Sequence, residues 1–156
     1  MTRILFVCLG NICRSPLAEA VFNHQAEKKK VRSKFYAASC GTANYHVGDP
    51  PDLRTIKNAL KNGVTIDHVG RQFNHSDFEE FDLILAMDKS NQANILRVPG
   101  ADKFANKVKL MRSFDPVDPG SDVPDPYYGT ERDFQEVFDI LDRSVRKLIE
   151  SFEEDA

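Results

Sequence analysis

A short loop near the start of the chain constrains the fold more than any other feature. The apolar run Ile4–Val7 predicts a buried strand, and Pro16–Ala20 predicts the first turn of a helix, where a proline fits because the N–H groups there have no partner. The loop that joins them reads Cys8-Leu9-Gly10-Asn11-Ile12-Cys13-Arg14-Ser15. A strand, a tight loop and a helix in this order are typical of the start of an α/β fold.

The residues of this loop favour the binding of an anion. Successive backbone N–H groups in a tight turn form an anion-binding nest, and the helix that follows adds unpaired N–H groups. The guanidinium of Arg14 matches two phosphate oxygens, while Gly10 and Asn11 tolerate the left-handed backbone that a curled loop needs. Because all these groups favour negative charge, we expect Cys8 to be a thiolate at neutral pH, with the Ser15 hydroxyl placed to donate to it.

Other interpretations of the cysteines stay open at this point. The spacing C-x5-R often occurs by chance, and a free cysteine is commonly buried and inert. Cys8 and Cys13 could instead bind zinc, although the further candidate ligands, Cys40 and four histidines, have no clean paired spacing. The nucleotide-binding pattern G-x-x-x-x-G-K-[ST] is absent from the sequence. We therefore expect neither a metal nor a cofactor.

Periodic apolar segments along the rest of the chain predict a single domain, residues 1–156. Strands alternate with helices, which predicts an α/β fold with three layers: a parallel sheet with helices on both faces, and the active loops at one edge. Further strands are expected at Phe35–Ser39, Phe81–Met87 and Val108–Met111. Helices are expected at Pro16–Lys28, at Pro51–Asn62 with Leu53, Ile56 and Leu60 facing inward, after the N-cap residue Asp88, and after the N-cap residue Thr130.

Composition argues against several classes of function. The formal net charge of −3 disfavours a broad nucleic-acid-binding surface. No apolar run approaches the length that spans a membrane, and the first residues lead directly into a strand rather than forming a signal peptide. Three cysteines, an odd number, of which one is needed as a thiolate, favour a reducing compartment. We expect a cytoplasmic protein that binds neither nucleic acid nor membrane.

Two motifs resemble those of one known family. The run Val7–Pro16 resembles the signature loop of the low-molecular-weight protein tyrosine phosphatases, and Asp125-Pro126-Tyr127-Tyr128 resembles their general-acid loop. The resemblance covers essentially the whole chain. It implies a four-stranded parallel sheet in the order 2-1-3-4, with the Cys8 loop at the switch point that follows the first strand.

Three aspartates, each followed by a proline, are candidates for the general acid. Asp115, Asp118 and Asp125 all have the sequence of an ordinary turn, and spacing alone does not choose among them. The aromatic pair Tyr127 and Tyr128 favours Asp125, since these rings could stack on a substrate ring while the carboxyl reaches its ester oxygen. The family resemblance indicates the same residue.

The activity that the resemblance implies is hydrolysis of phosphotyrosine and small aryl phosphates without a metal. Cys8 would attack phosphorus to form a cysteinyl-phosphate, Arg14 would stabilise the charge, and Asp125 would act as acid and then as base. The implied partners are phosphotyrosine proteins or peptides and inorganic phosphate or other oxyanions, and we expect a monomer or a weak dimer. The residues expected to contact substrate are Leu9, Gly10, Asn11, Ile12, Cys13, Ser15, Tyr45, Tyr127 and Tyr128.

The resemblance also implies residues that support the loop. Ser39 would be a partner of Asn11. His68 would pair with Glu19, and Asp88 would hold loops in place rather than react. A reversible Cys8–Cys13 disulfide, which the family suggests, would protect the nucleophile from over-oxidation.

Three alternative functions remain. Arsenate reductases of the same fold share the C-x5-R loop but need further redox-active cysteines, and this chain has none after Cys40. Phosphoarginine phosphatases resemble the loop but tend to carry threonine where Ile12 stands, so that Ile12 and the Tyr127-Tyr128 pair favour an aryl substrate. A non-enzymatic phosphate-binding module is disfavoured because a nucleophile, an arginine and a candidate acid are all present.

Overall fold

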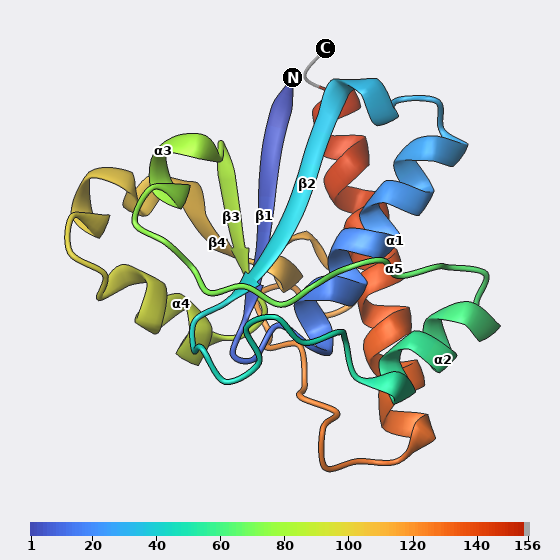
Figure 1. The fold of residues 1–156 in the computed structure, drawn as a ribbon. Coiled ribbons are helices and arrows are strands. Elements are labelled where there is room, and N and C mark those ends of the chain that lie inside the picture. The colour runs from blue at the N-terminus through green and yellow to red at the C-terminus, as the bar shows by residue number, and fades with distance from the viewer. Residues whose placement is uncertain (155–156) are drawn as a thin grey trace.

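The structure, a computed structural model, describes residues 1–154 and is built on a parallel sheet (Figure 1). Within these residues the sheet has four strands in the order β2-β1-β3-β4, and each neighbouring pair is parallel. The expected architecture and strand order are confirmed, with strand ends shifted by one or two residues. The strands are β1 (Thr2–Cys8), β2 (Phe35–Gly41), β3 (Leu83–Ala86) and β4 (Val108–Leu110).

The central position of β1 explains its continuous apolar sequence. Ile4–Val7 is fully buried, because β1 has a strand on each side and helices on both faces. In the register, Cys8 lies opposite Gly41 of β2, and Val7 lies opposite Ala86 of β3. The strand β2 lies on one side of β1, and β3 lies on the other. The loop after β1 therefore occupies the switch point of the sheet.

Helices cover both faces of the sheet, as Figure 1 shows. On one face lie α1 (Arg14–Lys28), α2 (Leu53–Lys61) and the long α5 (Glu131–Glu154). On the other lie α3 (Asp77–Glu80) and α4 (Lys89–Leu96), and short 3-10 segments complete the chain at η1 (Arg32–Lys34), η2 (Ala101–Lys107) and η3 (Met111–Phe114). No helix in the described part of the chain combines the length and the apolar character needed to cross a membrane.

Alternate residues of β1 point to opposite faces and divide the core in two. Ile4 and Phe6 belong to the cluster under α1 and α5, while Leu5 and Val7 belong to the cluster under α3 and α4. The sheet is thus fixed between two packed apolar layers. This arrangement holds the carboxyl end of β1, and with it Cys8, in one place.

The helix α2 has the expected position in the chain but not the expected inward face. Leu53 and Leu60 are 67% and 65% exposed, and the buried residues are Thr55, Asn58 and Ala59. The reason is that α1 and α5 already cover the sheet, so α2 packs on these helices instead. Its contact with α5 combines the buried Ala59 with a polar contact, in which Asn58 Nδ2 donates to Gln135 Oε1 at 2.9 Å. The prediction that Leu53 and Leu60 face inward was wrong.

The segment that follows β4 is anchored to α5 by a buried carboxylate. Asp115 has a fully buried side chain, which accepts from Arg112 Nε at 2.9 Å and from Arg143 Nε at 2.8 Å. Burial alone would raise the pKa of Asp115, but hydrogen bonds from Arg143, the Val117 N–H and Arg112 outweigh it and hold the pKa well below its usual range. This ion pair fixes the start of the segment that later carries Asp125.

Replacing Asp115 by asparagine should therefore destabilise the fold. Loss of one partner from a buried ion pair typically costs about 3–5 kcal/mol; because Arg143 is partly exposed, we expect about 2–3 kcal/mol in urea unfolding followed by circular dichroism. The exposed Asp118, which lies 3.7 Å from Arg112, supplies the control: Asp118→Asn should change stability by less than about 0.5 kcal/mol.

The pH dependence has a defined sign. The pKa of Asp115 is lower in the folded state than in the unfolded state. Its ionised carboxylate therefore adds to the free energy of unfolding above the unfolded pKa of about 4, and this contribution is lost as the pH falls below that value. The Asp115→Asn variant should therefore lose less stability than the wild type on acidification below about pH 4. Equal stability of the variant and the wild type at neutral pH would contradict the anchoring role.

Candidate active site

The loop after β1 curls around the sulfur of Cys8. The backbone N–H of Asn11 points at Cys8 Sγ across 3.3 Å, and Ser15 Oγ lies 3.0 Å from the same sulfur. Ser15 belongs to the first turn of α1, whose unpaired N–H groups and positive dipole end also face this region. The amide, the hydroxyl and the helix end all stabilise negative charge on the sulfur.

Asn11 holds the loop in its curled shape. Its φ of 59° is in the left-handed region, which asparagine tolerates better than most residues. Its side-chain amide donates to Ser15 Oγ at 2.8 Å and to Ser39 Oγ at 3.2 Å. Its carbonyl oxygen accepts from the Arg71 N–H at 3.1 Å and lies 2.7 Å from His68 Nε2. The side chain is buried among these partners and does not line the catalytic cavity.

His68 connects this network to α1. Its Nδ1 lies 3.6 Å from Glu19 Oε1, which places the two residues together as the resemblance implied. Burial raises the pKa of Glu19 to about 7, and burial together with the Arg71 charge lowers the pKa of His68. The pair connects the loop to α1 through the contact of His68 with Asn11.

Arg14 closes the other side of the loop. Its Nη1 donates to Asp88 Oδ2 at 2.7 Å and to the Val123 carbonyl at 2.9 Å, and its Nη2 lies 3.7 Å from Asp125 Oδ2. Burial alone would lower the pKa of Arg14, but the Cys8 and Asp88 charges outweigh it and raise the pKa. The Asp88 carboxylate also caps α4 by accepting from the Asn91 N–H, so one residue fixes both a helix and the guanidinium. Arg14 is held rigidly as a permanent cation.

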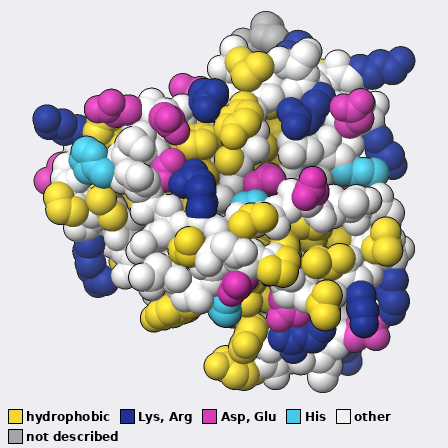
Figure 2. All heavy atoms as spheres, viewed as in Figure 1, with side chains coloured by type: hydrophobic (Ala, Val, Ile, Leu, Met, Phe, Trp, Pro, Cys, Tyr) yellow, Lys and Arg dark blue, Asp and Glu magenta, His cyan; other side chains and the backbone are white. Residues whose placement is uncertain are grey.

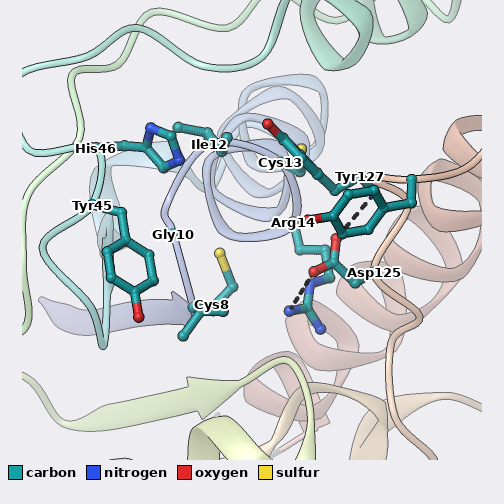
Figure 3. A pocket seen from close by; sticks show the side chains of 11 residues that line it. Cys8, Gly10, Ile12, Cys13, Arg14, Tyr45, His46, Asp125 and Tyr127 are labelled. Atoms are coloured by element: carbon teal, nitrogen blue, oxygen red, sulfur yellow. Dashed lines mark hydrogen bonds and ion pairs between the residues drawn. The ribbon is translucent and has the colours of Figure 1, made fainter.

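These groups surround a cavity of about 320 Å³, shown in Figure 3. The Cys8 sulfur lies at its floor, and Tyr45 and Tyr127 stand on opposite sides of it. The rings of Tyr127 and Tyr128 meet edge to face at 5.0 Å. The lining residues are Cys8, Leu9, Gly10, Ile12, Cys13, Arg14, Tyr45, His46, Asp125, Tyr127 and Tyr128.

The structure separates the three Asp-Pro aspartates. Asp125 lines the cavity, while Asp115 and Asp118 pair with Arg112. Asp125 Oδ1 accepts from the Tyr127 N–H at 3.1 Å, which leaves Oδ2 on the side of Arg14. The carboxyl is half exposed and free to meet a molecule in the cavity.

Other predicted residues lie around the cavity rather than in it. The Ser15 side chain is buried beneath the floor, where its Oγ also lies 3.3 Å from the carbonyl oxygen of Cys40. Ser39, Glu19, His68 and Asp88 likewise support the loop from behind. They reach it from separate segments because the carboxyl ends of parallel strands meet at one edge.

His46 is a lining residue that the sequence did not indicate. It lies above Gly10 in Figure 3, and its Nδ1 lies 3.2 Å from Asp49 Oδ2. A side chain at position 10 would meet the imidazole at 3.2 Å, so Gly10 makes room for it. Its position directly after Tyr45 in a turn-rich loop is the signal that could have indicated it.

The other two cysteines are buried thiols. Burial and, to a smaller extent, the nearby Asp52 charge raise the pKa of Cys13 to about 12. Cys13 is therefore a neutral thiol at the cavity wall, and the Cys8–Cys13 disulfide stays a prediction. Among the described residues, no three histidine, cysteine, aspartate or glutamate side chains are grouped to hold a metal ion.

Comparison with known proteins gives a consistent result. The profile of the family described as low molecular weight phosphotyrosine protein phosphatase matches residues 3–156. A protein of that description from Gallus gallus is 41% identical over 94% of this chain and 93% of its own length. Another from Schizosaccharomyces pombe is 45% identical over 87% of each chain. The crystal structure of a protein tyrosine phosphatase from Entamoeba histolytica, with Hepes in its active site, superposes with a TM-score of 0.94 at 40% identity over 99% of each chain.

Substitution of Asn11 tests whether its side-chain hydrogen bonds hold the loop in the shape that binds phosphate. Asn11→Gly keeps the positive φ but loses side-chain hydrogen bonds worth about 1 kcal/mol each, so we expect inorganic phosphate to bind at least about tenfold more weakly in calorimetric titration. Asn11→Ala should be less stable than Asn11→Gly by about 1 kcal/mol because of its positive φ. The exposed Asn106, on η2, gives a matched control in Asn106→Ala. Wild-type phosphate affinity in Asn11→Gly would contradict the supporting role.

Proposed function

Because the chain belongs to the low molecular weight phosphotyrosine protein phosphatase family, we propose that Cys8, Arg14 and Asp125 hydrolyse phosphotyrosine in two steps. The observation that supports this assignment is the convergence of the three groups on one cavity. A sulfur anion, a fixed cation and an accessible carboxyl are the groups that transfer of a phosphoryl group to cysteine requires.

In the first step, Cys8 Sγ attacks phosphorus in line with the departing phenol oxygen. The S–P bond forms as the P–O bond breaks, and Asp125 transfers its proton to the leaving oxygen. The loop amides and Arg14 stabilise the equatorial phosphoryl oxygens, and they do so without rearrangement because Asp88 and the Val123 carbonyl already orient the guanidinium.

In the second step, water hydrolyses the cysteinyl-phosphate. Asp125, now a carboxylate, accepts a proton from the attacking water, and the S–P bond breaks to return the Cys8 thiolate and inorganic phosphate. The Ser15 hydroxyl, 3.0 Å from the sulfur, donates to the thiolate as it leaves. Cysteine supplies the nucleophile and Arg14 the positive charge, so no step uses a metal.

Tyr45 and Tyr127 make the cavity suitable for an aryl phosphate. They stand on either side of Cys8, where their rings can flank the ring of a phosphotyrosine (Figure 3). The relatives named above are phosphotyrosine phosphatases, so neither the arsenate reductase nor the phosphoarginine phosphatase alternative is favoured. We propose phosphotyrosine proteins or peptides as the substrates.

Cys8→Ser should abolish turnover of p-nitrophenyl phosphate, because serine is not ionised at neutral pH and cannot replace the thiolate. Addition of a chelator should leave wild-type activity unchanged. Cys40→Ala provides the control, since Cys40 is buried in the cluster under α3 and α4 and should be dispensable for turnover. Retained activity in Cys8→Ser, or loss of activity with chelator, would refute the mechanism.

Asp125→Ala should lower kcat/KM most for substrates with a poor leaving group, because kcat/KM reports the first step, in which Asp125 is the acid. General-acid catalysis contributes about 10²–10⁴-fold, so we expect a loss in that range for phosphotyrosine and a much smaller loss for p-nitrophenyl phosphate in steady-state kinetics. Asp118→Ala, which removes another exposed Asp-Pro carboxyl, should behave as wild type. An equal loss for both substrates would argue against Asp125 as the acid.

A further inference from the structure

A second cavity, of about 250 Å³, lies between α2 and the start of α5. We call it the basic groove, because three of its lining residues are cations. It takes no part in the mechanism above. Its lining residues are Arg54, Lys57, Asn58, Lys61, Glu131 and Phe134.

Arg54 joins the basic groove to the catalytic cavity. The carbon at the centre of its guanidinium lies 5.3 Å from the ring centre of Tyr127, which lines the catalytic cavity, and 4.7 Å from that of Phe134, which lines the groove. Asp52 holds the guanidinium with two hydrogen bonds, from Nε at 3.1 Å and from Nη2 at 2.9 Å. One fixed cation thus forms the boundary between the two cavities, and a chain leaving the first can enter the second.

The charges of the basic groove leave a surplus of positive charge. Lys61 pairs with Glu131, and Arg54 pairs with Asp52. Lys57 forms no ion pair with any residue that the structure describes. Figure 2 shows basic and acidic side chains together over α2 and the start of α5, at the lower right. The free Lys57 ammonium makes this groove attractive to one more carboxylate.

The Tyr45 side of the catalytic cavity carries no comparable positive charge. Beyond Tyr45 lies a hollow of about 350 Å³ that shares Leu9 and Tyr45 with the catalytic cavity. All of its lining residues are uncharged, among them Thr42, Gln72 and Asn94. A peptide that crosses the active site would meet positive charge on the Tyr127 side and neutral surface on the Tyr45 side.

We propose that the basic groove binds an acidic side chain of the phosphopeptide substrate, on one flank of the phosphotyrosine only. An extended peptide advances about 3.3–3.6 Å per residue, so an aspartate or glutamate one to three positions from the phosphotyrosine reaches the groove past Arg54. Lys57 and Lys61 bind the carboxylate, and Arg54 adds its charge at the boundary. This inference rests on the proposed phosphotyrosine phosphatase function.

The expected preference is modest because the lysines are exposed. An exposed ion pair changes an equilibrium by a few-fold, so one acidic residue on the responsive flank should raise kcat/KM by about two- to fivefold. The gain should disappear at high salt, because the screening length falls to about 3 Å at 1 M ionic strength.

The test compares three phosphotyrosine peptides: one with neutral flanks, one with acidic residues on the amino-terminal flank and one with acidic residues on the carboxyl-terminal flank. The wild type should prefer one of the two acidic peptides. Lys57→Gln/Lys61→Gln should abolish this preference without changing kcat/KM for the neutral peptide. Glu131→Gln should increase the preference, because it releases Lys61 from its ion pair. Lys28→Gln/Lys34→Gln, which removes two exposed lysines outside the groove, should leave it unchanged.

Three outcomes would overturn the inference: equal rates for all three peptides, an equal gain for both acidic peptides, or a preference that survives in Lys57→Gln/Lys61→Gln. The first two would show that no local carboxylate site exists on one flank. Failure of the proposed function is recognised separately, since the wild type would then hydrolyse neither the neutral phosphotyrosine peptide nor p-nitrophenyl phosphate.

Discussion

Negative charge on the Cys8 sulfur is the requirement on which the rest of the structure depends. The Asn11 N–H, the Ser15 hydroxyl and the start of α1 all point positive groups at this atom. The same groups, with Arg14, prepare the space above the sulfur for a phosphate. Amide groups that converge on one point repel each other. The Asn11 side chain holds them in place through its contacts with Ser39 of β2 and with His68 and Arg71 on the segment between α2 and α3.

The parallel sheet explains how distant residues reach this loop. Ser39 comes from β2, Asp88 follows β3, and both strands end beside the carboxyl end of β1. Asp125 arrives on the long segment between β4 and α5, whose start is tied down by the Asp115 ion pairs with Arg112 and Arg143. The fold thus provides a rigid, buried floor around Cys8 and a more exposed rim that carries Asp125.

The sequence predicted the parts of the molecule in which local chemistry decides the structure. The loop, its arginine and the central strand could be predicted from neighbouring residues, while the strand order came from the family resemblance. Tertiary packing decided the rest. The inward face of α2 was predicted wrongly because α1 and α5 already cover the sheet, and His46 was missed because its place depends on the space above Gly10. The link from Arg54 to Tyr127 joins residues far apart in the chain and has no local signal.

The most direct measurement of the central claim is identification of the atom that carries the phosphoryl group during turnover. The enzyme would be mixed with a phosphotyrosine peptide, quenched rapidly in acid, digested and analysed by mass spectrometry. We predict phosphate on Cys8. With p-nitrophenyl phosphate, whose leaving group needs little help from an acid, the level of phosphorylated enzyme should rise in an Asp125 variant, because that carboxylate activates the water of the second step. Phosphate on another residue, or turnover with no phosphorylated enzyme at any time, would contradict the claim.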